Sequence, residues 1–233
     1  MKIVIFASCS KRKSISHPSQ PTCNELISKQ SRDKYNVSIT EKRSVKDMYR
    51  GALNISIVQA ISILRHYFDV KYYVISAGYG IVNENEILPP YDCSFSTMSF
   101  EEIQTRAEML EIPQDYRQII ENEKPDLVYL ALGKNYITAL GDWDSILNCK
   151  TIAFHPSTNE NVITLPADHV AVQEASSIGG LPIHGVVGYK GDLLLLTTRY
   201  LKNNSNPVEA LQDLLNNPDD LVYIVNTIRQ NMQ

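Results

Sequence analysis

The sequence MKIVIFASCSKRK, residues 1–13, opens the chain and decides the fold that we predict. Residues 2–7 form a short apolar run with β-branched side chains, which is typical of a strand buried on both faces. The run ends in a Ser-Cys-Ser triplet, residues 8–10, and three cations follow at residues 11–13. Ligands of open parallel sheets bind outside the carboxyl ends of the strands. The stretch therefore indicates a site for an anionic ligand, or else a solvated loop that begins with serines.

Three later apolar runs repeat this pattern, at residues 71–76, 126–132 and 150–154, and each ends in small or polar residues. Helical periodicity lies between them, over residues 45–67 and 99–122. Pro113 interrupts the second helical pattern and divides it into two shorter helices. Strands that alternate with helices predict βαβ units, and therefore an α/β fold with a mostly parallel sheet.

Length and composition predict one domain, because the chain has 233 residues, of which 43% are hydrophobic and 21% charged. We expect a core over residues 1–160 and a C-terminal extension over residues 161–233 that packs on the same domain. No apolar stretch is long enough for a membrane span, and the N-terminus lacks the zones of a secretion signal. These features favour a cytoplasmic protein without a membrane partner.

The four cysteines have no paired spacing and no histidine cluster near them. We therefore expect free thiols, with neither a zinc site nor a disulfide. Their positions are Cys9, Cys23, Cys93 and Cys149.

The net charge of −4 argues against a protein that coats nucleic acid through bulk electrostatics. The first fifty residues are locally basic, which suits either an anionic partner or a solvated loop. Residues 14–44 are polar and without periodicity, and they predict a long loop. Residues 176–188 predict a glycine-rich loop that carries His184, and two closing helices follow at residues 207–215 and 218–232.

Two residues are candidates for catalysis. Asp92 follows two prolines and Tyr91, which stiffen its loop, so its carboxylate could orient a water or stabilise a cation. Such an aspartate can equally cap backbone amides. His155 opens a His-Pro-Ser turn after a strand and could donate a hydrogen bond to a ligand, or serve the structure alone.

Other residues at the ends of the predicted strands are candidates for binding a substrate. Glycines after a strand let the backbone approach a ligand closely, and Cys9 is either a nucleophile or a buried thiol. Neither a P-loop nor a dinucleotide fingerprint occurs, which argues against ATP and NAD. The candidate binding residues are Cys9, Ser10, Lys11, Lys13, Ser76, Gly78, Tyr79, Gly80, Tyr91, Lys134, Asn135 and Ser157.

Four short motifs occur together in order: C-S-K-x-K at residues 9–13, D-M-Y-x-G at 47–51, S-A-x-x-G-I-V at 76–82 and P-Y-D at 90–92. Through these motifs the chain resembles an uncharacterised bacterial domain family related to the uracil-DNA glycosylase superfamily. The resemblance covers residues 1–156. The H-P-S triplet at residues 155–157 is similar to the motif that closes the uracil-DNA glycosylase pocket. The resemblance implies a three-layer α/β sandwich around a central, mostly parallel sheet.

The resemblance also implies a reaction, hydrolysis of the N-glycosidic bond of a modified base in DNA. One member of this broad group, associated with phage defence, removes glucosylated hydroxymethylcytosine from phage DNA. Asp92 would then serve the sugar and the water, and His155 the leaving base. Residues 78–80 would hold the base, with Tyr79 as a stacking surface. No metal or organic cofactor is implied.

The implied phosphate contacts come from Ser10, Lys11, Lys134 and Ser157. The water-activating G-Q-D-P-Y motif of the superfamily is absent after the first strand, where residues 9–11 read C-S-K. The acid must therefore come from elsewhere in the chain.

Three alternatives stay open. The protein could be an N-glycosidase or base-exchange transferase that acts on free nucleosides or nucleotides. It could be a tRNA-modifying relative that acts on deazaguanine, or a non-catalytic sensor that binds a nucleotide at the same sheet edge. The sequence leaves the oligomeric state open.

Overall fold

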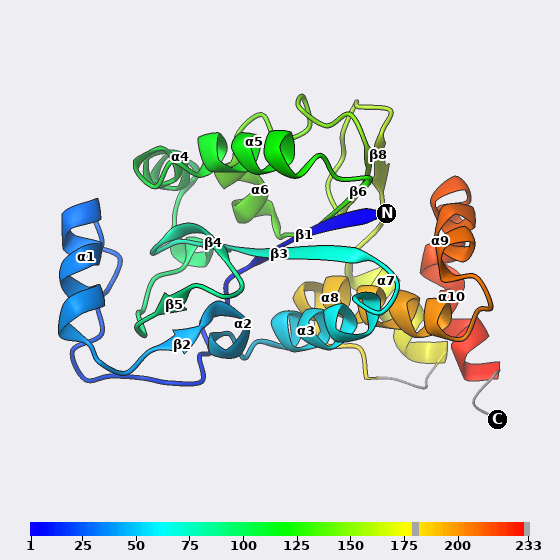
Figure 1. Cartoon of the computed structure of the whole chain (residues 1–233), viewed down its shortest axis with the longest axis horizontal. Coiled ribbons are helices and arrows are strands. Elements are labelled where there is room, and N and C mark those ends of the chain that lie inside the picture. The colour runs from blue at the N-terminus through cyan, green and yellow to red at the C-terminus, as the bar shows by residue number, and fades with distance from the viewer. Residues whose placement is uncertain (179–181, 231–233) are drawn as a thin grey trace.

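The structure is a computed structural model that describes residues 1–178 and 182–230 (Figure 1). A six-stranded sheet has the order β4-β3-β1-β6-β7-β8, and every neighbouring pair is parallel except β3 and β4. The predicted α/β fold with a mostly parallel sheet is thereby confirmed. The strands are β1 (Lys2–Ser8), β3 (Asp69–Ser76), β4 (Gly80–Asn83), β6 (Leu127–Ala131), β7 (Lys150–Ala153) and β8 (Val162–Thr164).

Helices cover both faces of this sheet, so the molecule has three layers (Figure 1). One face carries α4 (Phe100–Met109), α5 (Ile112–Glu123) and α6 (Lys134–Leu140), and the other carries α3 (Ala52–Leu64) and α8 (Gly185–Lys202). The predicted break near Pro113 is confirmed, because α5 begins there as a separate helix. No helix in the described part of the chain combines the length and apolar character that a membrane span needs.

The helix that we predicted over residues 45–67 is two helices, α2 (Val45–Met48) and α3. Residues 49 and 50 leave the helical path, because the chain here pairs with the loop that follows β1. The N–H of Ser14 donates to the Met48 carbonyl at 2.8 Å, and the N–H of Arg50 donates to the Arg12 carbonyl at 2.9 Å. Gly51 is the N-cap of α3, and its N–H donates to the Ser10 hydroxyl at 3.1 Å. Contacts with a distant segment therefore override the local periodicity.

The loop predicted over residues 14–44 is wrong in part, because it contains α1 (Lys29–Ser38). Ser28 and Ser31 form a capping box at the start of α1, and none of the helix's residues is buried. A helix without a buried face has no apolar periodicity to reveal it. The same segment ends in β2 (Arg43–Ser44), which pairs antiparallel with β5 (Ile87–Leu88).

The glycine-rich loop predicted over residues 176–188 is also wrong in part. α7 (His169–Ile178) reaches into it, α8 begins at Gly185, and residues 179–181 lie outside the described residues. A Cβ atom on Gly191 of α8 would lie 2.5 Å from the backbone oxygen of Leu53 in α3. This glycine therefore serves the close packing of two helices.

The remaining helices close the C-terminal part of the chain. α9 (Pro207–Asn216) and α10 (Asp219–Gln230) confirm the two predicted closing helices. The prediction for the second one extended to residue 232, which lies outside the described residues.

The expectation of four free thiols is wrong, because Cys23 and Cys93 form a disulfide. The two positions are 70 residues apart, so no local spacing could reveal the pairing. Cys9 and Cys149 are free, and Cys9 is buried.

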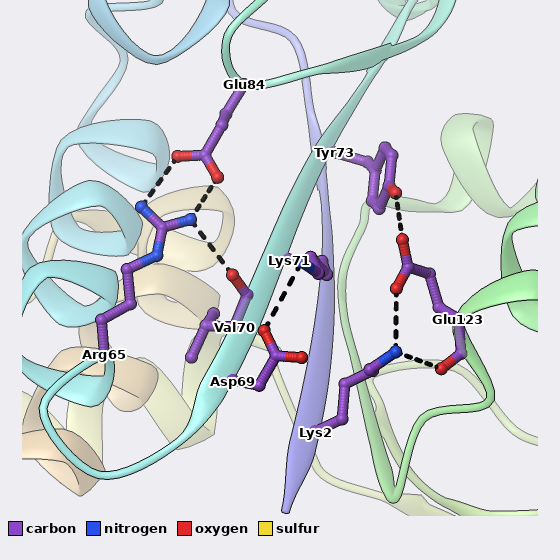
Figure 2. Close-up of polar contacts among 8 residues, drawn as sticks. All are labelled: Lys2, Arg65, Asp69, Val70, Lys71, Tyr73, Glu84 and Glu123. Carbon is purple, nitrogen blue, oxygen red and sulfur yellow. Dashed lines mark hydrogen bonds and ion pairs between the residues drawn. The ribbon is translucent and has the colours of Figure 1, made fainter.

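Polar contacts join the layers at the edges of the sheet (Figure 2). Arg65 at the end of α3 forms an ion pair with Glu84 beyond β4, and its guanidinium also donates to the Val70 carbonyl at 3.1 Å. On the other face, the Glu123 carboxylate accepts hydrogen bonds from Lys2 of β1 and Tyr73 of β3, both at 3.1 Å. These contacts fix α3 and α5 to the central strands β1 and β3 and to the residue that follows β4.

Candidate functional site

The main candidate site is a cavity at the carboxyl edge of the sheet. β1 ends at Ser8 and β6 ends at Ala131, and the two strands are parallel neighbours. The residues that follow them therefore meet at one edge, where ligands of such sheets bind. A cavity of about 420 Å³ lies there, between these strand ends, the start of α3, the loop near the 3-10 helix η1 (Phe95–Thr97) and the start of α8. Its lining residues are Ser8, Cys9, Ser10, Lys11, Gly51, Ala52, Leu53, Asn54, Ser94, Ser96, Gly133, Lys134, Asn135, Tyr136, His184, Val187 and Gly188.

Five of the predicted binding residues line this cavity. Lys11 and Lys134 are exposed at its rim. The Ser10 hydroxyl is already engaged, because it donates to the Arg12 carbonyl at 2.7 Å and accepts from the N–H of Gly51. The Asn135 side-chain amide donates to the Phe95 carbonyl at 2.8 Å. The rim charge therefore comes from the two lysines. The five residues are Cys9, Ser10, Lys11, Lys134 and Asn135.

Three other predicted residues form a buried network beside the cavity. The Tyr91 hydroxyl lies 2.7 Å from the Ser76 hydroxyl and 2.7 Å from the Tyr49 hydroxyl. The Lys13 ammonium nitrogen lies 4.0 Å from the centre of the Tyr91 ring. Burial raises the pKa of both tyrosines, and proximity to Cys9 raises it further. The two tyrosine hydroxyls of the network therefore stay protonated. Cys9, which acts on both tyrosines, also lines the cavity.

Lys13 itself is largely enclosed in this network. Burial lowers the pKa of its ammonium group, and the proximity of Cys9 and Asp92 opposes that effect. Its cation rests on an aromatic face, a favourable arrangement for a partly desolvated charge.

The backbone N–H groups of the glycine-containing turn after β3 form hydrogen bonds within the turn. The N–H groups of Gly78 and Tyr79 donate to the Ser76 hydroxyl, at 3.1 and 3.0 Å. A Cβ atom on Gly78 would lie 2.9 Å from the Tyr91 ring, and Gly80 has a φ of +79°, so both positions require glycine. None of residues 78–80 lines the cavity. The two amides therefore close the turn around the Ser76 hydroxyl.

The two predicted catalytic residues do not line the cavity, and neither does Ser157. Asp92 is exposed, and its N–H donates to the Pro21 carbonyl at 2.8 Å. His155 is half-buried, and burial together with the charges of Lys190 and Lys134 lowers its pKa. The Ser157 hydroxyl donates to the Asp144 carboxylate. These three residues therefore lie outside the lining to which Cys9, Ser10, Lys11, Lys134 and Asn135 belong.

Sequence reasoning missed a polar pair formed by His184, which lines the cavity, and Asp192, which does not. The Nδ1 atom of His184 lies 3.1 Å from an Asp192 carboxylate oxygen, and the backbone N–H of His184 donates to the other oxygen at 2.8 Å. The Ser56 hydroxyl of α3 also donates to this carboxylate, at 2.7 Å. In the sequence, the pair is a histidine directly before a helix and an aspartate eight residues later, within that helix. We did not recognise it because the glycines of this segment predicted a loop.

Asn54 is a second residue that the sequence did not single out. Its side chain is 2% exposed and donates to the Ser8 carbonyl at 3.0 Å, while its side-chain oxygen has no partner among the described residues. No group of three His, Cys, Asp or Glu side chains in the described part of the chain is arranged to hold a metal ion.

These features define an α/β protein with a lysine-rimmed cavity at the carboxyl edge of a parallel sheet. The chain belongs to DUF6884, a family of unknown function, whose sequence profile matches residues 33–153, slightly more than half of the chain. The matched region includes the start of α3 and the start of α6, but neither Cys9 nor His184. No curated protein and no solved structure matches the chain.

Proposed function

We propose that the protein is a DNA glycosylase that hydrolyses the N-glycosidic bond of a modified base, with the target nucleotide bound in the cavity at the carboxyl edge of the sheet. One observation carries the proposal. Lys11 and Lys134 come from the ends of two neighbouring strands and meet at the rim of one cavity. Among the described residues that line this cavity, none is an aspartate or a glutamate.

The charge and size of the cavity support a nucleotide as its ligand. Two cations without a lining carboxylate favour an anion such as a phosphate. The first turn of α3 borders the same space, and the N-terminus of a helix carries unpaired N–H groups and a partial positive charge. The volume of about 420 Å³ lies in the range of pockets that bind small molecules.

The motifs shared with the glycosylase-related family support DNA as the molecule that contains this nucleotide. Residues 9–11, from the first of these motifs, line the cavity. Such enzymes extrude the target base from the helix, at a cost of a few kcal/mol for unstacking and unpairing. Phosphate contacts by the two lysines would offset part of that cost. The candidate base is glucosylated hydroxymethylcytosine, as occurs in phage DNA.

The test is incubation of the protein with ordinary, hydroxymethylated and glucosylated DNA, followed by mass spectrometry for free base and abasic sites. We expect release from a modified DNA. Absence of release from every DNA, with cleavage of free nucleosides, would replace the proposal with a nucleoside N-glycosidase.

Charge variants test the part of the proposal that concerns phosphate. The double variant Lys11→Gln/Lys134→Gln should weaken DNA binding and reduce its dependence on salt. The slope of log affinity against log salt should fall by about 0.9 for each duplex phosphate that the variant no longer neutralises. Lys150→Gln is the matched control, because this exposed lysine begins β7 at the opposite edge of the sheet. Equal salt slopes for the double variant and the wild type would contradict phosphate binding at this rim.

A further inference from the structure

The contact between His184 and Asp192 fixes the hydrogen on the imidazole ring. The Asp192 side chain is 5% exposed, and its carboxylate faces Nδ1 of His184 at 3.1 and 3.2 Å. A carboxylate oxygen accepts hydrogen bonds, so Nδ1 is the donor in this contact. In the neutral ring, Nε2 is then left as a hydrogen-bond acceptor.

The surroundings of the pair leave the ring open and the carboxylate enclosed. The His184 side chain is 45% exposed and lines the 420 Å³ cavity. Asp192 is covered by α3, from which Ser56 donates to it at 2.7 Å. A Cβ atom on Gly188 would lie 2.5 Å from the Cβ of His184, so the start of α8 holds the ring in a space that admits no side chain at position 188.

Charged groups reach the pair from three elements. Lys11 and Lys134 line the same cavity from the ends of β1 and β6. On α8, Arg199 borders a second hollow of about 270 Å³, which His184 and Asp192 also line. Apart from the pair itself, the charged side chains that line these two hollows are therefore cations.

We propose that His184 is the catalytic base of this cavity and that Asp192 is its positioning residue. The inference rests on the proposed function and supplies the group that neither Asp92 nor His155 supplies within the cavity. Nε2 takes a proton from a water as the water oxygen forms a bond to C1′ of the sugar. The bond from C1′ to the base nitrogen breaks, its electron pair leaves with the base, and the base takes a proton from the imidazolium or from solvent.

The first experiment compares His184→Gln with the wild type on an oligonucleotide that contains glucosylated hydroxymethylcytosine. General base catalysis typically contributes about 10²- to 10⁴-fold, so the rate of base release should fall by that factor. Oligonucleotide affinity should stay within about threefold, because a glutamine keeps the polar surface. His66→Gln, which changes an exposed histidine beyond the end of α3, is the matched control and should keep the wild-type rate.

The second experiment reads the tautomer by nitrogen-15 NMR of the imidazole in the free protein, and therefore does not depend on activity. We expect the Nδ1–H form in the wild type and a loss of this form in Asp192→Asn, whose amide can donate to Nδ1. Asp192→Asn should also slow base release, whereas a purely structural role for Asp192 would leave the tautomer unchanged in a folded variant.

The outcomes separate this inference from the proposed function. Wild-type protein that releases no base from any DNA overturns the proposed function. Equal rates for the wild type and His184→Gln overturn the role of His184 alone. An Nε2–H tautomer in the free wild-type protein overturns the role of the pair, whatever the activity.

Discussion

Cys23 and Cys93 are joined by a disulfide across 70 positions of sequence, and their Cα atoms lie 4.7 Å apart. Arg106 reinforces this connection, because its guanidinium donates to the carbonyls of Cys23, Leu26 and Ala77. The disulfide joins the segment before α1 to the loop that follows β5, and Arg106 of α4 connects the same segment to Ala77 in the turn that follows β3.

Removal of the disulfide should lower the stability of the fold. Cys23→Ser/Cys93→Ser should lose about 2–5 kcal/mol of the free energy of unfolding, because a long loop is no longer closed in the unfolded chain. Urea denaturation with and without a reductant measures the loss, and the reduced wild type should match the double variant. Cys149→Ser removes a free thiol and is the control. A titration that finds four thiols in the denatured, unreduced protein would contradict the disulfide.

Replacement of Arg106 should also destabilise the protein. Arg106→Leu leaves three carbonyl groups without this donor, two of them in buried hydrogen bonds, and each unsatisfied buried acceptor costs about 1–3 kcal/mol. We therefore expect a loss of at least about 2 kcal/mol in urea denaturation. Arg117→Leu on the exposed side of α5 should change the free energy of unfolding by less than about 0.5 kcal/mol. Similar losses in the two variants would show that the contacts of Arg106 contribute little.

A methyl group at Gly191 should force α8 away from α3. The added Cβ would lie 2.5 Å from the Leu53 carbonyl oxygen and 3.1 Å from the Leu53 Cα, and both atoms belong to backbone. Overpacking of this kind costs about 1–3 kcal/mol, so thermal unfolding of Gly191→Ala should shift to lower temperature. Gly133→Ala is the matched control, because nothing lies within 4 Å of its Cβ position. Wild-type stability of Gly191→Ala would rule out the backbone contact.

The stability of the protein should fall in mild acid because of His155. Burial lowers the pKa of this histidine below its usual value of 6.5, and the charges of Lys190 and Lys134 lower it further. The unfolded chain therefore binds the proton more readily, so the free energy of unfolding decreases as the pH falls from 6.5 through the lower pKa of the folded protein. His155→Gln should show a smaller loss between pH 8 and pH 5 in urea denaturation. An identical loss in the variant would contradict the shift, and His66→Gln serves as the exposed control.

The sheet could be predicted because its central strands carry local signals. β1 and β6 are short apolar runs buried on both faces, and the polar residues after them meet at one edge because parallel strands share a direction. The same reasoning placed Cys9 and Lys134 at a common site. The short edge strand β8 has no buried residue and gave no comparable signal.

The rest depends on contacts between distant parts of the chain. The disulfide requires knowledge of which loops meet, and the helix α1 has no buried face that would set a periodicity. Asp92 follows a rigid Pro-Pro-Tyr sequence, but rigidity does not determine the direction in which a side chain points. His184 and Asp192 become a pair only once Gly191 is assigned to a helix that packs on α3.

The contact between Gly191 and Leu53 limits the size of the ligands that the cavity can bind. α3 and α8 each contribute residues to the lining of the cavity. Their backbones are in contact at Gly191 and Leu53, so the two helices cannot move closer together there. A larger ligand would need space from another part of the lining, such as the 3-10 helix η1, where Ser94 caps the helix and Ser96 lies within it. Substitutions around η1 would then change the size of ligand that the cavity accepts, while the packing of α3 on α8 stays the same.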